Sequence, residues 1–445
     1  MRKSSPRSRT ADPSPHSRRG RVTRAIGILT SVPLVVGMAA CAPSDAAEER
    51  NTLTFVYNGD AAEAKSFQGL FDAFNEEHPE IELKAQGIAA RSWSDFSNTV
   101  ATRMAGGTDL DIIQIATEGQ RLFASKGLLE PLDPYIEQDQ ELVNDYFADQ
   151  NPSVLDWNRK YSSTDGSTYY MPGPYNTVGL YVNTEIFEQA GVELPTGDWT
   201  WDEFKAAGHQ IKETTGAFLY PAAADGQFAS VSPWLLTNGA NSFNEDWDTA
   251  TFDSPEAIES AEFVRSLVED GLSPEPGGEF DAPTQFAQGN LATFPGGRWP
   301  TGDIKRLDFV DSTQIVSFPH NIENGSPVGW DAWPILKNSK NKDAAWTFIK
   351  FLISERAGEY FAANPNGASI PARVSAATSQ PFLDGAPVGT TKLVDALEYA
   401  TPIPSPDRGP EAEQIILEAW LNAITGTSSA EDALTEANKK LTDLL

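Results

Sequence analysis

The feature that most constrains the fold of this chain is a regular alternation of strand-forming and helix-forming segments. Strand-forming runs occur at 53–57 and 110–115, which are rich in β-branched or aromatic residues, and at 81–88, where apolar and polar residues alternate. Between them, 67–74 and 94–104 place their apolar residues three and four apart, which predicts two one-faced helices. A β-α-β-α-β order of this kind is typical of a mostly parallel sheet covered by helices.

A second α/β region is predicted to begin near residue 170. Thr200 and Glu203 have the spacing of a capping box, which predicts the start of a helix there, and Ser254 followed by Pro255 predicts the start of another. The tail after Glu411 has helical periodicity in two segments, and Gly426 is expected to separate them. The chain therefore contains at least two α/β units of ordinary domain size.

The N-terminal forty residues have the composition of an export signal rather than of a folded segment. Eight Lys or Arg precede Cys41, and the apolar run at 25–40 is shorter than the roughly 20 residues that a membrane-spanning helix needs. The ending Gly37-Met38-Ala39-Ala40-Cys41 resembles the bacterial lipoprotein signal, in which a peptidase cuts before a cysteine that carries lipid. We expect a signal peptide at 1–40, a lipidated Cys41 and a flexible tether at 41–51, so that the protein is exported and anchored to the outer face of the cytoplasmic membrane. An ordinary secretory signal is the alternative, and general secretory and twin-arginine export both stay open.

Charge and motif content restrict the possible partners. Of 33 Lys and Arg only 25 follow residue 40, against 62 of the 63 Asp and Glu, so residues 41–445 carry a net charge near −37. Such a surface repels nucleic acid and anionic lipid. The histidines that follow the signal stand far apart, and no phosphate loop, dinucleotide fingerprint or nucleophile elbow is present. We therefore expect no cofactor, no metal and no nucleic acid, and contact with the membrane only through the lipid.

Several segments resemble one known family in their order and spacing. Residues 126–132 match its "G-L-L-x-P-L" segment, and residues 286–299 match its "F-x-x-G-x-x-A…G-x-W" element. Residues 107–113 are similar to its "G-x-P-D-I" strand but lack the proline, and 53–60 and 344–352 resemble its first binding loop and a late helix. By these segments the chain resembles the extracellular solute-binding proteins of ABC importers, in the maltose-binding-like sugar branch.

The resemblance implies a two-lobed, periplasmic-binding-protein-like α/β fold of type II. Each lobe is expected to be a mostly parallel sheet flanked by helices, and crossing hinge strands join the lobes. We predict lobe 1 at 52–172 plus 318–358 and lobe 2 at 176–316 plus 360–445. The implied function is a monomeric, non-enzymatic receptor that closes on a sugar or oligosaccharide and delivers it to the importer's permease subunits. The alternatives are a secreted carbohydrate-active enzyme with a positioned carboxylate pair, or the same fold binding a polyamine or other non-sugar solute.

Sugar recognition requires flat aromatic faces for the ring and planar polar side chains for paired hydroxyls. In parallel sheets ligands bind beyond the carboxyl ends of the strands, which indicates the loops at 58–60 and 116–119. Period-2 alternation sets Trp330 on the opposite face to Asp331 and Trp333, so at least one of the three has a structural role, and we favour Trp330 and Asp331 as ligand-binding residues. The expected ligand-binding residues, several of them implied only by the resemblance, are Asn58, Asp60, Arg91, Trp93, Glu118, Tyr175, Asn176, Gln227, Phe228, Trp234, Arg298, Trp299, Trp330, Asp331 and Arg408.

Overall fold

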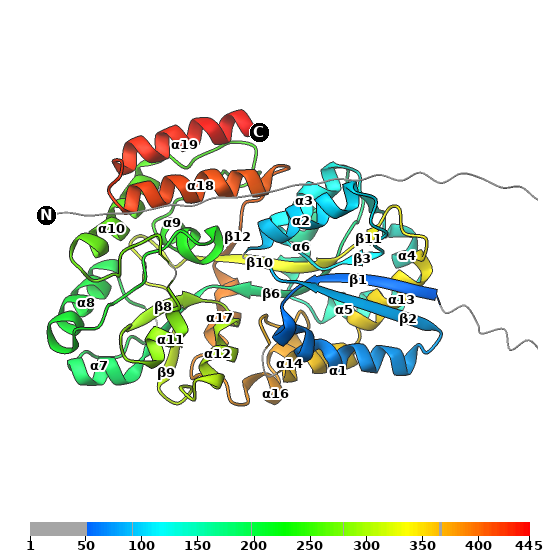
Figure 1. Ribbon diagram of the computed structural model, residues 1–445, viewed down its shortest axis with the longest axis horizontal. Coiled ribbons are helices and arrows are strands. Elements are labelled where there is room, and N and C mark those ends of the chain that lie inside the picture. The colour runs from blue at the N-terminus through cyan, green and yellow to red at the C-terminus, as the bar shows by residue number, and fades with distance from the viewer. Residues whose placement is uncertain (1–50, 91, 197, 279, 365–366) are drawn as a thin grey trace, which may run out of the picture. The chain divides into compact units, whose positions relative to one another are not determined.

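Three β-sheets organise the part of the chain that this computed structural model describes, residues 51–445 except 91, 197, 279 and 365–366 (Figure 1). The predicted signal peptide, Cys41 and the tether up to residue 50 lie outside the described residues, and so does Arg91.

The first sheet confirms the predicted β-α-β-α-β order. Its strand order is β2-β1-β3-β11-β5, and β1 runs parallel to both β2 and β3. β11 pairs antiparallel with β3 and with β5, so the parallel part is limited to the first three strands. The strands of this sheet are β1 (Asn51–Asn58), β2 (Ile81–Ile88), β3 (Ile112–Ile113), β5 (Leu129–Glu130) and β11 (Ile335–Leu336).

Helices cover both faces of this sheet because β1 alternates two sets of apolar side chains. Phe55 packs on the side of α1 (Ala61–Glu77), and its ring lies 5.2 Å from that of Phe348. Val56 belongs to the core on the other side, which α2 (Trp93–Ala105) covers. Figure 1 shows α1 and α2 on opposite sides of β1 and β2. Because helices cover both faces of this sheet, a ligand can approach it where the strands end.

The second sheet combines strands from distant parts of the sequence. β10 (Ser326–Trp333) is its centre, antiparallel to β6 (Met171–Thr177) and β4 (Ile115–Ala116) and parallel to β12 (Ala400–Pro402). Pro334 separates β10 from β11 of the first sheet, because proline cannot continue the hydrogen-bonded ladder. β6 and β10 therefore lie side by side where the chain passes between the predicted lobes (Figure 1).

The third sheet differs from the prediction. Its order is β8-β7-β9, and β7 (Gly179–Asn183) is antiparallel to both β8 (Thr293–Gly296) and β9 (Thr313–Val316). The prediction that the sheet of lobe 2 is mostly parallel is therefore wrong. The physical reason is that β8 and β9, linked through α12 (Pro300–Arg306), run in the same direction but flank β7 instead of pairing with each other.

The local helix signals agree with the sequence analysis. The Thr200 side chain and Glu203 form the predicted capping box at the start of α8 (Trp201–Thr215). The Ser254 side chain accepts a hydrogen bond from the Ala257 backbone at the start of α10 (Pro255–Glu269).

The tail forms two helices, α18 (Gly409–Ile424) and α19 (Ala430–Leu444), which lie side by side in Figure 1. Gly426, at φ 71°, lies between them and has the left-handed conformation that favours glycine. The other helical segments are α3 (Thr117–Ser125), α4 (Asp133–Gln138), α5 (Gln140–Ala148), α6 (Pro152–Tyr161), α7 (Thr184–Ala190), η1 (Gln227–Val231), α9 (Ser232–Leu236), α11 (Ala282–Ala287), α13 (Lys342–Leu352), α14 (Glu355–Ala363), α15 (Val374–Ala377), α16 (Gln380–Leu383), α17 (Thr391–Asp395) and η2 (Ala396–Glu398).

The strands divide between the sheets along the predicted lobe boundaries. The first sheet draws only on the residues assigned to lobe 1 and the third only on those assigned to lobe 2, while the second sheet draws on both. Residues 50–445 nevertheless form one compact unit, so the lobe boundaries stay a prediction. None of the helices within the described ranges combines the length and the apolar character that crossing a membrane requires.

Candidate ligand-binding site

A cavity of about 820 Å³ lies where the first sheet ends and the crossing strands begin. Its wall includes the loop after β1, the start of α2, the start of α3, and residues of β6 and β10. Segments from the other half of the chain complete it, around η1, α12 and α18. Nine of the predicted ligand-binding residues line this cavity: Asn58, Asp60, Trp93, Glu118, Tyr175, Asn176, Phe228, Trp299 and Asp331.

Aromatic side chains form one part of the cavity wall. Trp299 is 38% exposed, and its ring lies 6.0 Å from that of Phe228 at an interplanar angle of 53°. Trp93 is partly buried and meets Phe96 edge-on at 5.6 Å, which fixes its ring at the start of α2. Trp299 thus presents an accessible aromatic surface of the type that packs on the C–H face of a sugar ring.

The position of Trp299 depends on the glycine two residues before it. A Cβ atom on Gly297 would lie 2.4 Å from the Trp299 ring and 2.7 Å from Asn176 Oδ1. Asn176 Oδ1 accepts a hydrogen bond from the Arg298 backbone N–H at 2.9 Å, and Asn176 Nδ2 donates to the Ala368 carbonyl, also at 2.9 Å. The amide of Asn176 is therefore occupied in holding three segments of the wall together.

Glu118 and Asp331 provide carboxylates at the base of the cavity. Asp331 is 6% exposed, and its Oδ2 accepts a hydrogen bond from Gln114 Nε2 at 2.7 Å. Glu118 is partly buried, and its Oε2 atom is fully buried with no hydrogen-bond partner among the described residues. Ser405 donates a hydrogen bond to the Glu118 carbonyl at 2.8 Å, which positions the start of α3.

These carboxyl groups lose protons at unusually high pH. Burial, followed by the nearby charges of Glu413 and Asp331, raises the pKa of Glu118 to about 8. Burial and, less strongly, the charge of Glu63 raise the pKa of Asp331 to about 7, although the Gln114 hydrogen bond acts in the opposite direction. Burial also raises the pKa of Glu63 to about 7. The cavity is thus an unfavourable place for negative charge.

The alternation of β10 explains which residues of the Trp330–Asp331 pair reach the cavity. Gly329 and Asp331 both line it, whereas Trp330 points to the opposite side and is 1% exposed. Trp330 Nε1 donates a hydrogen bond to Asn158 Oδ1 at 3.1 Å within the core. The structure therefore places Asp331 in the site and Trp330 in the core.

Four further predicted residues do not line the cavity either. Trp234 is fully buried among core aromatic rings, and its Nε1 donates to the Tyr220 hydroxyl at 3.2 Å. Gln227 is buried in η1, where its Nε2 donates to the Ser242 hydroxyl at 3.1 Å. Phe228, predicted from the same segment, does line the cavity, so one of the three side chains predicted there reaches it and two do not.

The two arginines are placed by different interactions. Arg298 is 2% exposed, and its guanidinium lies over the Phe382 ring at 4.3 Å and donates to the Phe382 carbonyl at 3.1 Å. Arg408 is exposed at the start of α18 and pairs with Glu411 three residues later. Neither guanidinium lines the cavity.

Several lining residues were missed by the sequence analysis. Gln114 interrupts the apolar run of the β3–β4 segment, and a polar residue inside a buried strand could have identified it as a candidate site residue. Glu413 lies on the buried face of α18, seven residues before the buried Trp420, so helical periodicity also pointed to it. Phe361 and Asp225 carry no comparable signal, because only tertiary structure brings their segments to the cavity.

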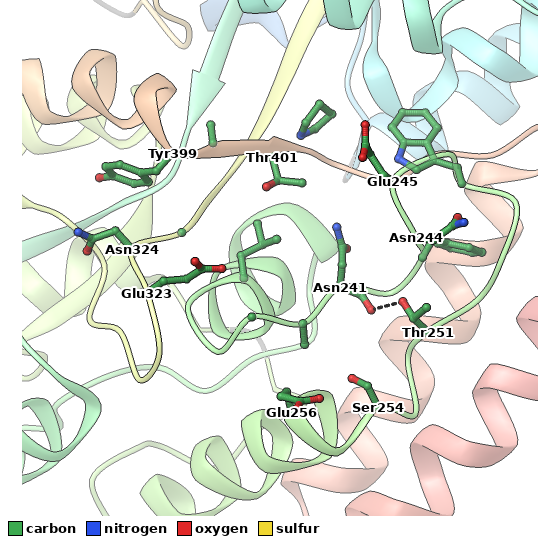
Figure 2. Close-up of a pocket in the computed structure, with 18 of the residues that line it drawn as sticks. Asn241, Asn244, Glu245, Thr251, Ser254, Glu256, Glu323, Asn324, Tyr399 and Thr401 are labelled. Atoms are coloured by element: carbon green, nitrogen blue, oxygen red, sulfur yellow. Dashed lines mark hydrogen bonds between the residues drawn. The ribbon is translucent and has the colours of Figure 1, made fainter.

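A separate cavity of about 570 Å³ contains none of the predicted residues (Figure 2). Figure 2 shows Glu323 and Tyr399 projecting into it from the segments next to β10 and β12, and Glu256 from the start of α10. Its Tyr161 ring already stacks on Trp247 at 4.1 Å, so it offers less free aromatic surface than the cavity at Trp299. In the part of the chain that the structure describes, no group of three or more His, Cys, Asp or Glu is arranged to hold a metal ion.

Comparison with known proteins identifies relatives over most of the chain. The family model described as bacterial extracellular solute-binding protein matches residues 58–359. A Brucella abortus relative named as a binding protein is 26% identical over 92% of this chain and 96% of the relative. The mannitol-binding protein of Pseudomonas aeruginosa is 25% identical over 88% and 92%, respectively.

A solved structure shows the same architecture. The ABC substrate-binding protein from Listeria monocytogenes, in complex with cycloalternan, superposes with a TM-score of 0.78 at 22% identity, covering 89% of this chain and 99% of that protein. This likeness confirms the predicted two-lobed fold of type II, with the antiparallel third sheet as the correction noted above.

Proposed function

Because the chain belongs to the family of bacterial extracellular solute-binding proteins, we propose that it captures a sugar or oligosaccharide in the cavity beside Trp299. The observation that carries this proposal is the combination of an accessible tryptophan face with the carboxylates of Glu118 and Asp331 in one cavity. Aromatic faces and planar hydrogen-bonding groups are the two components of sugar recognition. Relatives named for mannitol and a structural neighbour bound to cycloalternan support the sugar class.

The same proposal gives the crossing strands a role in closure. β6 and β10 are paired along their length, and each continues into segments that belong to different predicted lobes. A ligand that contacts the β1 loop on one side and Trp299 on the other stabilises the closed arrangement, because only that arrangement makes both sets of contacts. In this proposal the closed, monomeric receptor delivers its solute to the permease subunits of an ABC importer.

We further propose that lipid on Cys41 retains the receptor at the outer face of the membrane. The lipoprotein-like ending before Cys41 supports this, and β1 begins at Asn51, only ten residues later. That distance gives a short tether between the anchor and the folded part of the chain.

Isothermal titration calorimetry with a panel of mono- to tetrasaccharides tests the proposed function. At roughly −0.3 kcal/mol per heavy atom, a disaccharide of about 23 heavy atoms is expected to bind with a Kd on the order of ten micromolar. Chromatography of the same mixtures after long incubation should show the sugar unchanged. Conversion to products would favour the enzyme alternative, and the absence of binding by every sugar would refute the proposal.

A further inference from the structure

The charged side chains among the described residues of the cavity wall are all acidic. Leaving Asp60 aside, five carboxylates line the cavity without taking part in any ion pair among the described residues, and no described lining residue is Lys, Arg or His. A sixth, Asp303, also lines the cavity, but it pairs with Arg306 at 2.7 Å. The five carboxylates are those of Glu63, Glu118, Asp225, Asp331 and Glu413.

The hydrogen bonds that these carboxylates accept come from uncharged donors. Asp331 accepts from the Gln114 amide, Glu413 from the Gln227 backbone N–H at 3.2 Å, and Asp225 from the Ser230 hydroxyl. Glu118 Oε2 is buried and accepts none. Buried carboxylates are stabilised by a paired cation far more than by neutral donors, and the described residues of the wall supply no such cation to these five.

The aromatic surface is also suited to a positive group. Trp299 exposes its ring to the same cavity, with Phe228 and Trp93 nearby in the wall. The face of an indole attracts an ammonium group as well as the C–H face of a sugar ring. A ligand that carries both features would use the aromatic and the acidic parts of the wall together.

The acidic lining continues beyond Trp299. A neighbouring cavity of about 520 Å³ shares Trp299, Asp225, Ala229 and Asp303 with the first, so the two lie next to each other at this tryptophan. Its wall adds Glu275 and Asp281, and its described lining again includes no Lys, Arg or His. The space on both sides of Trp299 exceeds what a single ring occupies, which indicates a ligand of more than one unit.

We infer that the solute is an ammonium-bearing sugar, namely an amino sugar or a short oligomer of amino sugars, in preference to a neutral one. This inference rests on the proposed function, because the sugar ring accounts for the aromatic surface and the amine accounts for the unpaired carboxylates. Binding of the amine places a positive charge beside Glu118 and Asp331, which no described lining residue provides. Neutral hydroxyl groups supply hydrogen bonds but no charge.

Calorimetry with matched sugar pairs tests the inference on the full-length protein. Three pairs differ only at carbon 2: glucosamine and glucose, galactosamine and galactose, and mannosamine and mannose. The β-1,4 trimers of glucosamine and glucose, which differ at carbon 2 of each ring, form the fourth pair. We expect the amine member of at least one pair to bind tenfold or more tightly than its neutral partner at pH 7, and its affinity to fall as salt is added. Spermidine serves as a cation without a sugar ring.

The outcomes separate this inference from the proposed function. Neutral sugars that bind as tightly as their amines would overturn the inference and leave the sugar receptor intact. Binding of spermidine without any sugar would overturn both, and binding of no amine at all would overturn the inference.

Charge-removing variants provide a second test. Glu118→Gln and Asp331→Asn should each weaken binding of the amino sugar roughly tenfold more than they weaken binding of its neutral partner. Asp311→Asn removes one exposed carboxylate away from the cavity and controls for the net charge. Equal losses for amine and neutral ligands in the two cavity variants would overturn the inference, since a neutral hydrogen-bonding role predicts that result.

Discussion

Replacing Trp299 with alanine removes the largest accessible aromatic surface of the cavity. A tryptophan side chain offers up to about 250 Å² for burial, and the 38% of Trp299 that is exposed therefore corresponds to roughly 95 Å². At about 25 cal/mol per Å², complete coverage by a ligand is worth roughly 2.4 kcal/mol, and half coverage roughly 1.2 kcal/mol. These values correspond to roughly sixtyfold and eightfold changes in affinity. We therefore expect Trp299→Ala to weaken sugar binding about tenfold or more.

Calorimetry on the wild-type protein and the variant measures this change directly. The fold should be little affected, because Trp299 is partly exposed and contributes mainly a tilted contact with Phe228. Tyr360→Ala is a matched control, since Tyr360 is equally exposed at 38% and does not line the cavity. An unaltered Kd in Trp299→Ala, or an equal loss in Tyr360→Ala, would refute the assignment of Trp299 to the site.

Three further predictions concern stability and processing. Folding raises the pKa of the Glu118 carboxyl, so the folded state binds more protons than the unfolded state, and the protein without ligand should lose stability as pH rises from about 4.5 to about 8. Glu118→Gln should make the accompanying decline in melting temperature shallower. An unchanged slope would contradict the raised pKa of Glu118. Gly297→Ala should lower the free energy of unfolding by about 1–3 kcal/mol because its Cβ would meet the Trp299 ring at 2.4 Å; Gly278→Ala, with open space around its Cα, is the denaturation control and should cost less. Mass spectrometry of the protein from its native host should find the signal peptide absent and lipid on Cys41, and an unmodified Cys41 would refute the anchor.

Features that depend on neighbouring residues were predictable from the sequence. The helix beginnings at Thr200 and Ser254, and the break at Gly426, follow from side chains and backbone preferences within a few positions. The parallel pairing of β1 with β2 and β3 follows from the helices between these strands, because each helix returns the chain to the end of the sheet where the previous strand began.

The direction of the third sheet was not predictable in the same way. The segments between β7, β8 and β9 are long enough for either strand direction, so connection length does not decide the pairing. Only the tertiary structure shows that β7 lies between β8 and β9.

The site was predictable where a local rule pointed to it. Asn58 is the last residue of β1, Glu118 lies just after β4, and alternation along β10 set Asp331 opposite Trp330. The resemblance alone assigned Gln227 and Trp234, and the packing of their segment turns both side chains into the core. Glu413 comes to the cavity from a helix near the end of the sequence. Only its position on the buried face of that helix, read from helical periodicity, can identify it in advance.

A crystal structure of the protein with the sugar that binds most tightly in calorimetry would locate the bound ligand. We expect a sugar ring stacked on the Trp299 indole, with carboxylate oxygens of Glu118 and Asp331 within hydrogen-bonding distance of its polar groups. A sugar bound instead in the cavity of Figure 2, or in the Trp299 cavity without contact to Trp299, Glu118 and Asp331, would contradict this expectation.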